Sequence, residues 1–257
     1  MDKLHSCELF VLDMDGTLYL GDTVLPGAHE FVRRLAKTGR RYVYLTNNSS
    51  RSASDYVNRL RHLGFPCERE DVFTSGEASA LYLQESHPGA SVYVVGTRAL
   101  CGELAAQGVR LTEETPDMVL AGFDTELTYA KLQKAVSFLR HGAAFLAANP
   151  DLVCPVDGGE VLPDCGSLCA LLTAATGRKP VFIGKPERRM VDILSKKFGV
   201  PNGRICCVGD RLYTDIAVAA NAGAVSALVL SGEATRPMLD ASALKPDYVF
   251  DSVRDIL

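Results

Sequence analysis

The strongest constraint on the fold of this chain is an alternation of short apolar runs with helical patterns. Residues 9–12 form an apolar, β-prone run, and residues 42–45 form the next one. Between them Ala28, Phe31 and Leu35 recur at the spacing of one helix face. Strands that are apolar throughout and separated by helices are typical of parallel sheets covered on both faces. We therefore expect an α/β fold with a doubly wound parallel sheet.

The alternation continues in two later parts, and the middle part is a candidate for a second domain. Strands are expected there at 92–96, 118–121 and 145–148. The last part predicts strands at 181–183, 205–208, 227–230 and 248–250. The sequence thus predicts one domain from residues 1–79 and 179–257, with an α/β domain inserted at 80–178.

Composition excludes several classes of protein. The chain of 257 residues is 47% hydrophobic and 23% charged, with a net charge of −4 and no basic block. A nucleic-acid partner is therefore not expected. The longest uncharged stretch, 216–232, contains Asn221 and Gly223 and is interpreted as helix, turn and strand instead of a membrane span. The N-terminus lacks the pattern of a signal peptide, and eight cysteines in such a chain are expected to be reduced, so a cytoplasmic location is expected.

Two patterns that could indicate a zinc site are weak. Cys165 and Cys169 have a spacing that could be half of a zinc site, but no convincing second half follows. The five histidines fall away from the strand ends, and no zinc site is expected from them.

Polar side chains follow four of the predicted strands, at the point where each strand ends. In chain order they are Asp13 and Asp15, then Thr46 and Asn47, then Lys185, then Asp210 and Asp215. In open parallel sheets, ligands bind at the carboxyl ends of the strands. These residues are therefore expected to share one site.

The residue types in this set suggest phosphoryl transfer. Three or more acids around one point cannot all stay ionised without a counter-charge. Mg²⁺ supplies such a charge, because it takes carboxylate ligands and binds substrate phosphate. A lysine, a hydroxyl and turn amides can stabilise the transferring oxygens. Asp13 and Asp15, one residue apart, offer a nucleophile beside a group that moves protons.

The motifs in this order resemble the haloacid dehalogenase (HAD) superfamily of phosphohydrolases. The resemblance extends from Asp13-x-Asp15-Gly-Thr through Thr46 and Lys185-Pro to Gly-Asp210-x4-Asp215. Residues 45–49 and 184–186 are similar to the NagD / p-nitrophenylphosphatase branch, subfamily IIA. This resemblance implies a Rossmann-like HAD core and a C2-type α/β cap domain, inserted between the second and third motifs.

The resemblance also implies a role for each residue. Asp13 would attack phosphorus and form an aspartyl-phosphate, and Asp15 would protonate the leaving group and then activate water. Mg²⁺ would be held by Asp13, by the main-chain carbonyl of Asp15 and by Asp210. Asp215 would hold the lysine or a metal water. The phosphoryl oxygens would be bound by Thr46, Asn47 and Lys185.

The expected function is a Mg²⁺-dependent phosphatase of small phosphomonoesters, such as nucleotide or sugar phosphates. Three alternatives remain open: a phosphotransferase or phosphomutase, a non-catalytic phospho-ligand sensor, and a hydrolytic dehalogenase, which would not need Asp15. The segment 149–151 resembles a substrate-facing cap segment but could equally be a plain turn. Arg211 and Tyr213 are weaker candidates for substrate contact. The branch often pairs through its caps, which implies a homodimer.

Overall fold

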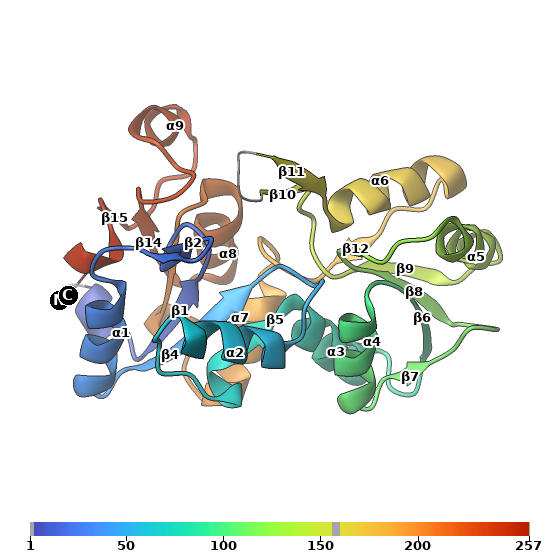
Figure 1. The fold of residues 1–257 in the computed structure, drawn as a ribbon, viewed down its shortest axis with the longest axis horizontal. Coiled ribbons are helices and arrows are strands. Elements are labelled where there is room, and N and C mark those ends of the chain that lie inside the picture. The colour runs from blue at the N-terminus through green and yellow to red at the C-terminus, as the bar shows by residue number, and fades with distance from the viewer. Residues whose placement is uncertain (1–2, 156–159, 257) are drawn as a thin grey trace. The chain divides into compact units, whose positions relative to one another are not determined.

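The computed structural model describes residues 3–155 and 160–256, and the chain divides into two compact units. The first unit contains residues 1–46, 56–73 and 185–257. The second contains residues 47–55 and 74–184. Figure 1 labels the elements of both units.

The first unit is built on a six-stranded sheet in the order β15-β14-β13-β1-β4-β5. Its strands are β1 (Leu9–Asp13), β4 (Arg41–Thr46), β5 (Val72–Thr74), β13 (Ile205–Gly209), β14 (Val225–Val229) and β15 (Tyr248–Phe250). Its helices are α1 (Ala28–Lys37), α2 (Ala53–His62, begun in the second unit), α7 (Arg189–Phe198), α8 (Ala217–Ala222) and α9 (Arg236–Ala241). A short antiparallel pair, β2 (Tyr19–Leu20) and β3 (Thr23–Val24), follows β1.

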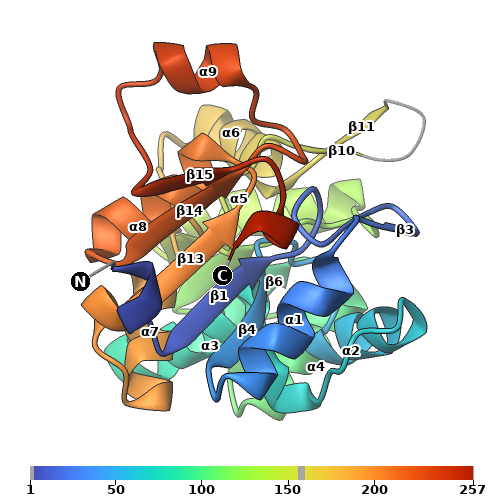
Figure 2. The same cartoon turned by 90° about the vertical axis from the view of Figure 1, so that its left-hand side faces the viewer.

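The central strand of this sheet is β1, which pairs in parallel with β13 on one side and β4 on the other. Its residues Leu9, Phe10, Val11 and Leu12 are all buried. Because right-handed crossovers to β4 and from β13 to β14 run in opposite directions, α1 and α8 cover opposite faces of the sheet (Figure 2). The carboxyl end of β1 therefore lies where the strand order reverses, which is where parallel sheets bind ligands.

The second unit contains a five-stranded parallel sheet in the order β12-β9-β8-β6-β7. Its strands are β6 (Ser91–Val95), β7 (Arg110–Leu111), β8 (Met118–Ala121), β9 (Ala144–Ala147) and β12 (Val181–Phe182). Its helices are α3 (Ser75–Ser86), α4 (Arg98–Ala106), α5 (Tyr129–Arg140) and α6 (Cys165–Thr176). One apolar cluster packs α3 and α4 on the sheet, and another packs α5 and α6. The predicted doubly wound α/β class is confirmed.

The boundaries of the units differ from the sequence prediction at three segments. Residues 47–55 and 74–79 belong to the second unit, although the prediction assigned them to the first. The predicted strand at 181–183 was also expected in the first unit. It forms β12 and pairs with β9 of the second sheet, with Val181 beside Leu146. A run of three apolar residues predicts a strand but not which sheet it joins, because pairing partners depend on non-local contacts.

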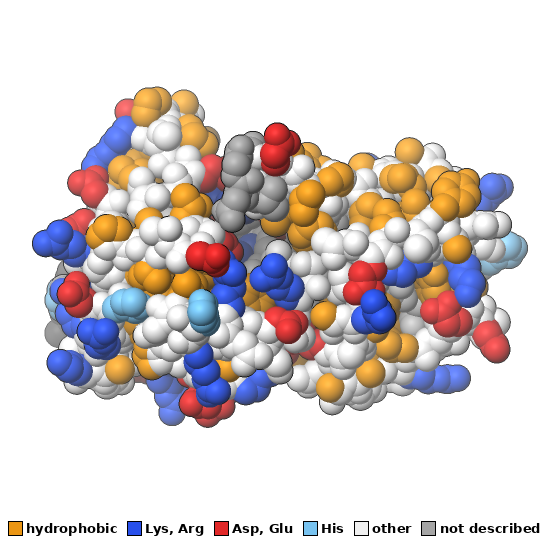
Figure 3. All heavy atoms as spheres, in the orientation of Figure 1, with side chains coloured by type: hydrophobic (Ala, Val, Ile, Leu, Met, Phe, Trp, Pro, Cys, Tyr) orange, Lys and Arg blue, Asp and Glu red, His pale blue; other side chains and the backbone are white. Residues whose placement is uncertain are grey.

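After β9, the strands β10 (Val153–Pro155) and β11 (Val161–Pro163) pair in antiparallel. Several apolar side chains in and next to β10, β11 and α6 are exposed, and Figure 3 shows hydrophobic side chains over these elements. They are Leu152, Val153, Val161, Leu162 and Leu171. Among the described residues, no helix has the length and apolarity that a membrane crossing requires.

Candidate active site

The site begins where β1 ends at Asp13. The next residues turn sharply, with the Gly16 amide donating to the Tyr19 carbonyl at 2.8 Å. Gly16 has a φ of +83°, a left-handed conformation that favours glycine. This turn leaves the Asp13 side chain largely buried and the next acid, Asp15, exposed. The two carboxylates predicted to work together therefore lie in different environments.

Lys185 is the buried cation of the site. Its side chain is 4% exposed, and its Nζ donates to Asp13 Oδ1 and to Asp215 Oδ1, each at 2.6 Å. Burial alone would lower the pKa of Lys185, but the two carboxylates outweigh burial and raise that pKa above its usual range. Lys185 therefore stays protonated and holds both carboxylates in place.

Asp210 follows β13 and is almost fully buried. Its Oδ2 accepts the Glu233 amide at 2.7 Å, while its buried Oδ1 has no hydrogen-bond partner among the described residues. Two glycines leave room for this carboxylate, because a Cβ would lie 2.3 Å from Oδ2 at Gly16 and 2.0 Å at Gly232. Asp210 thus presents one buried oxygen that needs a donor or a cation.

Asp215 lies in a π-helical turn, Leu212–Ile216, that precedes α8. Because this turn already begins after Arg211, Asp215 is not the N-cap of α8. Asp215 Oδ2 accepts the Arg211 amide at 3.1 Å, and Oδ1 accepts Lys185. The bond to Lys185 joins residues 30 positions apart in sequence, and helix periodicity does not reveal such a contact.

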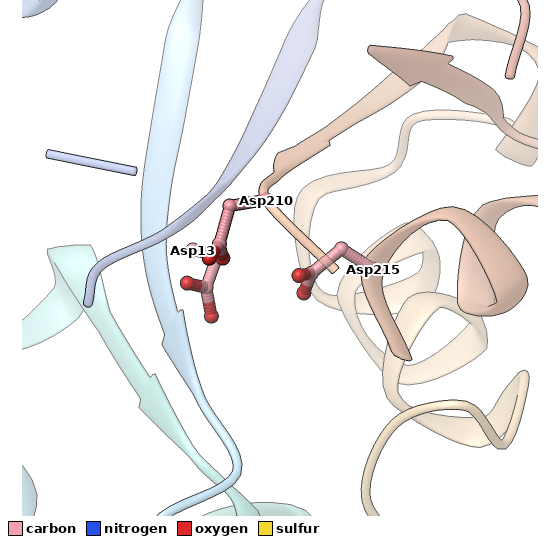
Figure 4. A group of neighbouring side chains, drawn as sticks. All are labelled: Asp13, Asp210 and Asp215. Carbon is pink, nitrogen blue, oxygen red and sulfur yellow. The ribbon is translucent and has the colours of Figure 1, made fainter. Parts of the chain in front are cut away.

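Three carboxylates of the site lie close together. Asp13, Asp210 and Asp215 each have an oxygen within 4.8 Å of the others, and Figure 4 shows them turned toward one another. Burial raises the pKa of Asp13 well above its usual range, against the lowering by Lys185, and both other acids add to the rise. Burial and Asp215 raise the pKa of Asp210 to about 6.

This donor set fits a hard divalent cation. Three carboxylates lie near two cationic side chains, Lys185 and Arg211, and Asp210 Oδ1 is buried without a hydrogen-bond donor among the described residues. Mg²⁺ prefers oxygen ligands and takes one or two protein carboxylates. Asp210 and Asp13 have oxygens suited to that role, whereas both Asp215 oxygens already accept hydrogen bonds. The metal and catalytic roles of these residues stay predictions.

The predicted phosphate-binding residues divide between the units. Thr46 ends β4 and is buried in the first unit, one residue beyond the Asp13–Leu45 pair of the sheet. Asn47 belongs to the second unit, where its side-chain amide donates to Asp151 Oδ2 at 2.8 Å. The predicted roles of both residues in phosphate binding stay predictions.

Sequence reasoning missed the loop 231–234 after β14. Ser231 Oγ donates to the Gly16 carbonyl at 3.0 Å, and Glu233 supplies the amide on Asp210. The Glu233 carboxylate also pairs with Arg211 Nε at 3.0 Å. The only sequence signal was the Ser-Gly pair after an apolar strand, which marks a turn without indicating its partners.

Comparison with known proteins identifies the family to which this chain belongs. Residues 10–110 match the family described as haloacid dehalogenase-like hydrolase, and residues 182–256 match the family described as HAD-hydrolase-like. The 5′-nucleotidase YutF of Bacillus subtilis is 35% identical over 96% of both chains. The crystal structure of 4-nitrophenylphosphatase from Thermotoga maritima superposes with a TM-score of 0.95, at 45% identity, over 99% of this chain and 97% of that one.

A further solved relative is glycerol phosphate phosphatase Rv1692 from Mycobacterium tuberculosis, in complex with magnesium. It is 34% identical, with a TM-score of 0.91, over 99% of this chain and 77% of that one. The resemblance that the sequence motifs indicated, including the NagD / p-nitrophenylphosphatase branch, is confirmed.

Proposed function

This chain belongs to the haloacid dehalogenase-like hydrolases, and we propose that it hydrolyses small phosphomonoesters with Mg²⁺ and an aspartyl-phosphate intermediate. Within the family it is a phosphoric monoester hydrolase similar to NagD and 4-nitrophenylphosphatase. One observation carries the proposal. Buried Lys185 holds the Asp13 carboxylate at 2.6 Å, beside an Asp210 oxygen that is buried without a hydrogen-bond donor among the described residues. A held carboxylate next to a cation site is what nucleophilic attack on phosphorus needs.

In the first step, an Asp13 oxygen forms a bond to phosphorus as the bond from phosphorus to the ester oxygen breaks. Lys185 keeps Asp13 oriented through Oδ1, so the second oxygen is the one available for attack. Asp15, exposed on the same turn, donates a proton to the departing oxygen. Thr46 and Asn47 donate hydrogen bonds to the phosphoryl oxygens. Bound Mg²⁺, held by Asp13, Asp210 and the Asp15 carbonyl, would neutralise charge on the phosphoryl group.

In the second step, Asp15, now a carboxylate, takes a proton from water. That water attacks phosphorus, the bond to Asp13 breaks, and orthophosphate is released. The Asp13 carboxylate is regenerated, and Lys185 again pairs with it. Splitting hydrolysis in this way replaces one difficult displacement by two easier ones.

Hydrolysis of p-nitrophenyl phosphate with and without Mg²⁺ tests the proposal. We expect turnover that EDTA abolishes and Mg²⁺ restores. In Asp13→Asn we expect kcat to fall by about 1,000-fold or more, since removing a single group that stabilises the transition state already costs about 100- to 1,000-fold. Asp22→Asn, whose carboxyl is 85% exposed in the following loop, is the matched control and should retain activity. Full activity in Asp13→Asn would refute the mechanism.

The physiological substrate is proposed only as a class. The relatives are named for nucleotides, glycerol phosphate and nitrophenyl phosphate, which share a phosphomonoester and differ in the leaving group. A panel of nucleotide, sugar and polyol monophosphates ranked by kcat/KM would identify the preferred leaving group. A phosphotransferase would instead show product formation that depends on an added acceptor alcohol.

A further inference from the structure

The chain passes between its two units at four places, after residues 46, 55, 73 and 184. Two of these crossings adjoin proposed site residues. Asn47 follows Thr46 by one peptide bond, and Gly184 precedes Lys185 by one. Thr46 and Lys185 therefore enter the first unit directly from residues that the second unit holds. The contacts that fix Asn47 and Gly184 within the second unit therefore bear on the proposed phosphate-binding groups.

Asn149 lies at the centre of the contacts that hold this region. It is fully buried, directly after β9. Its amide Nδ2 donates to Asp151 Oδ2 at 2.9 Å and to Asp164 Oδ1 at 3.0 Å, and its Oδ1 accepts from Ser49 Oγ at 3.1 Å. With every polar atom in use and no exposure, Asn149 supports the structure and does not face a substrate.

Asp151 connects Asn149 to the first crossing. A single carboxylate oxygen, Oδ2, accepts from Asn149 Nδ2 and from Asn47 Nδ2, at 2.9 and 2.8 Å. Asp151 is thus an acceptor that joins the buried network to the side chain of Asn47. Hydrogen bonds to a charged acceptor are stronger than neutral ones, so this contact restrains Asn47 more than an ordinary turn would.

Gly184 connects the same network to the second crossing. Its amide donates to the Ala148 carbonyl at 2.8 Å. A Cβ at Gly184 would lie 2.7 Å from Asn47 Oδ1 and 3.3 Å from Asn149 Cα, so these three residues are in close contact. Asn47 and Gly184, the second-unit residues at these two crossings, therefore lie against one another and next to residues 148–149.

We propose that Asp151 is a positioning residue for phosphate binding, which fixes Asn47 directly and Gly184 through Asn149 and its neighbour Ala148, and through them sets the places from which Thr46 and Lys185 enter the site. The inference rests on the proposed function of Thr46, Asn47 and Lys185. It assigns a role to a segment, 149–151, whose sequence was compatible with either a substrate contact or a plain turn. Asp151 acts through its neighbours and needs no contact with the substrate.

The other two crossings supply a matched control. Glu103 on α4 is also buried, and it accepts from the Ala53 amide at 2.9 Å and from Thr74 Oγ1 at 2.8 Å. It therefore holds the segments at the crossings after residues 55 and 73. Ser75, next to Thr74, donates its Oγ to the Asn47 carbonyl at 2.6 Å, so the crossing after residue 73 also reaches Asn47. Glu103→Gln removes neither partner of that bond nor any group of the Asp151 network, so it loosens the other two crossings and leaves these contacts in place.

The experiment compares Asp151→Ala, Asp151→Asn and Glu103→Gln in the full chain. For Asp151→Ala we expect a rise in KM for p-nitrophenyl phosphate of about tenfold or more, with a parallel rise in the dissociation constant of inorganic phosphate measured by calorimetry. The Mg²⁺ concentration for half activation should change less than KM does, because the network reaches the metal site one step further on, through the bond of Lys185 to Asp13. Asp151→Asn retains an acceptor oxygen and should restore KM to within about threefold of wild type.

Glu103→Gln should leave KM within about twofold, even if its melting temperature falls. The proposal is wrong if Asp151→Ala binds phosphate as wild type does, or if Glu103→Gln raises KM equally, since that would indicate general loosening. If Asp151→Ala does not fold, Asp151→Leu, of similar size and without an acceptor, replaces it. Calorimetry separates the two hypotheses, because wild-type protein that binds phosphate but does not hydrolyse the ester refutes only the proposed function.

Discussion

Replacing Lys185 by methionine should strongly destabilise the metal-free protein. The substitution keeps most of the side-chain volume but leaves Asp13 and Asp215 facing one another without the cation that bonds both at 2.6 Å. The three side chains are 4%, 16% and 3% exposed, so solvent screens little of the resulting repulsion. Removing one partner of a buried pair costs about 3–5 kcal/mol. We expect Lys185→Met to fall in that range.

A double-mutant cycle identifies the cause. Asp215→Asn removes one of the two carboxylates, so the double variant Lys185→Met, Asp215→Asn should cost less than the sum of the single variants, by about 1–3 kcal/mol. The assay is urea unfolding in EDTA near pH 7.5. Lys134→Met removes a pair of similar length, 2.7 Å from Glu113 but exposed, and should cost less than about 1 kcal/mol. Additive costs in the cycle, or a Lys185→Met cost as small as that of the control, would refute the reasoning.

Two further predictions concern Asp210. In the metal-free protein the pKa of Asp210 is about 6, above the usual value of 3.8, so the folded protein binds this proton more tightly than the unfolded chain does. The free energy of unfolding should therefore fall by up to roughly 3 kcal/mol as pH rises from about 4 to about 6. Unfolding in EDTA should show this slope in wild type and a flatter one in Asp210→Asn; equal slopes would contradict the assignment. Gly232→Ala places a Cβ 2.0 Å from Asp210 Oδ2 and should raise the Mg²⁺ concentration for half activation at least tenfold, whereas Gly203→Ala, with open space around it, should not. Unchanged activation in Gly232→Ala would argue against Asp210 as a ligand.

The sequence predicted the elements that local pattern determines. The apolar run at 9–12 correctly predicted β1, which the structure extends by one residue to Asp13, and four strand-end motifs in order indicated the family. Parallel strands place their carboxyl ends along one edge, so Asp13, Asp210 and Asp215, which follow β1 and β13, could be expected together before any distance was known. Lys185 bonds Asp13 and so joins this set as predicted, although the strand before it belongs to the other sheet.

The errors and omissions arise from non-local contacts. Val181 and Phe182 are apolar enough for a strand in either sheet, and only pairing with β9 decides which. Asp215 looks like a helix cap, yet it bonds Lys185, 30 residues away in sequence, and the backbone forms a π-helical turn there. The contact of Glu233 with Asp210 depends on how β14 ends, which no spacing in the sequence records.

The central claim, that Asp13 becomes phosphorylated, is tested most directly in the Asp15→Asn variant with p-nitrophenyl phosphate. The p-nitrophenolate group leaves without needing a proton, so the first step should proceed, whereas hydrolysis should stall without a base to activate water. The account predicts a burst of about one equivalent of p-nitrophenolate per protein and, after acid quench and peptide mass spectrometry, a phosphoryl group on Asp13. Steady turnover at the wild-type rate, or a phosphoryl group on any other residue, would contradict it.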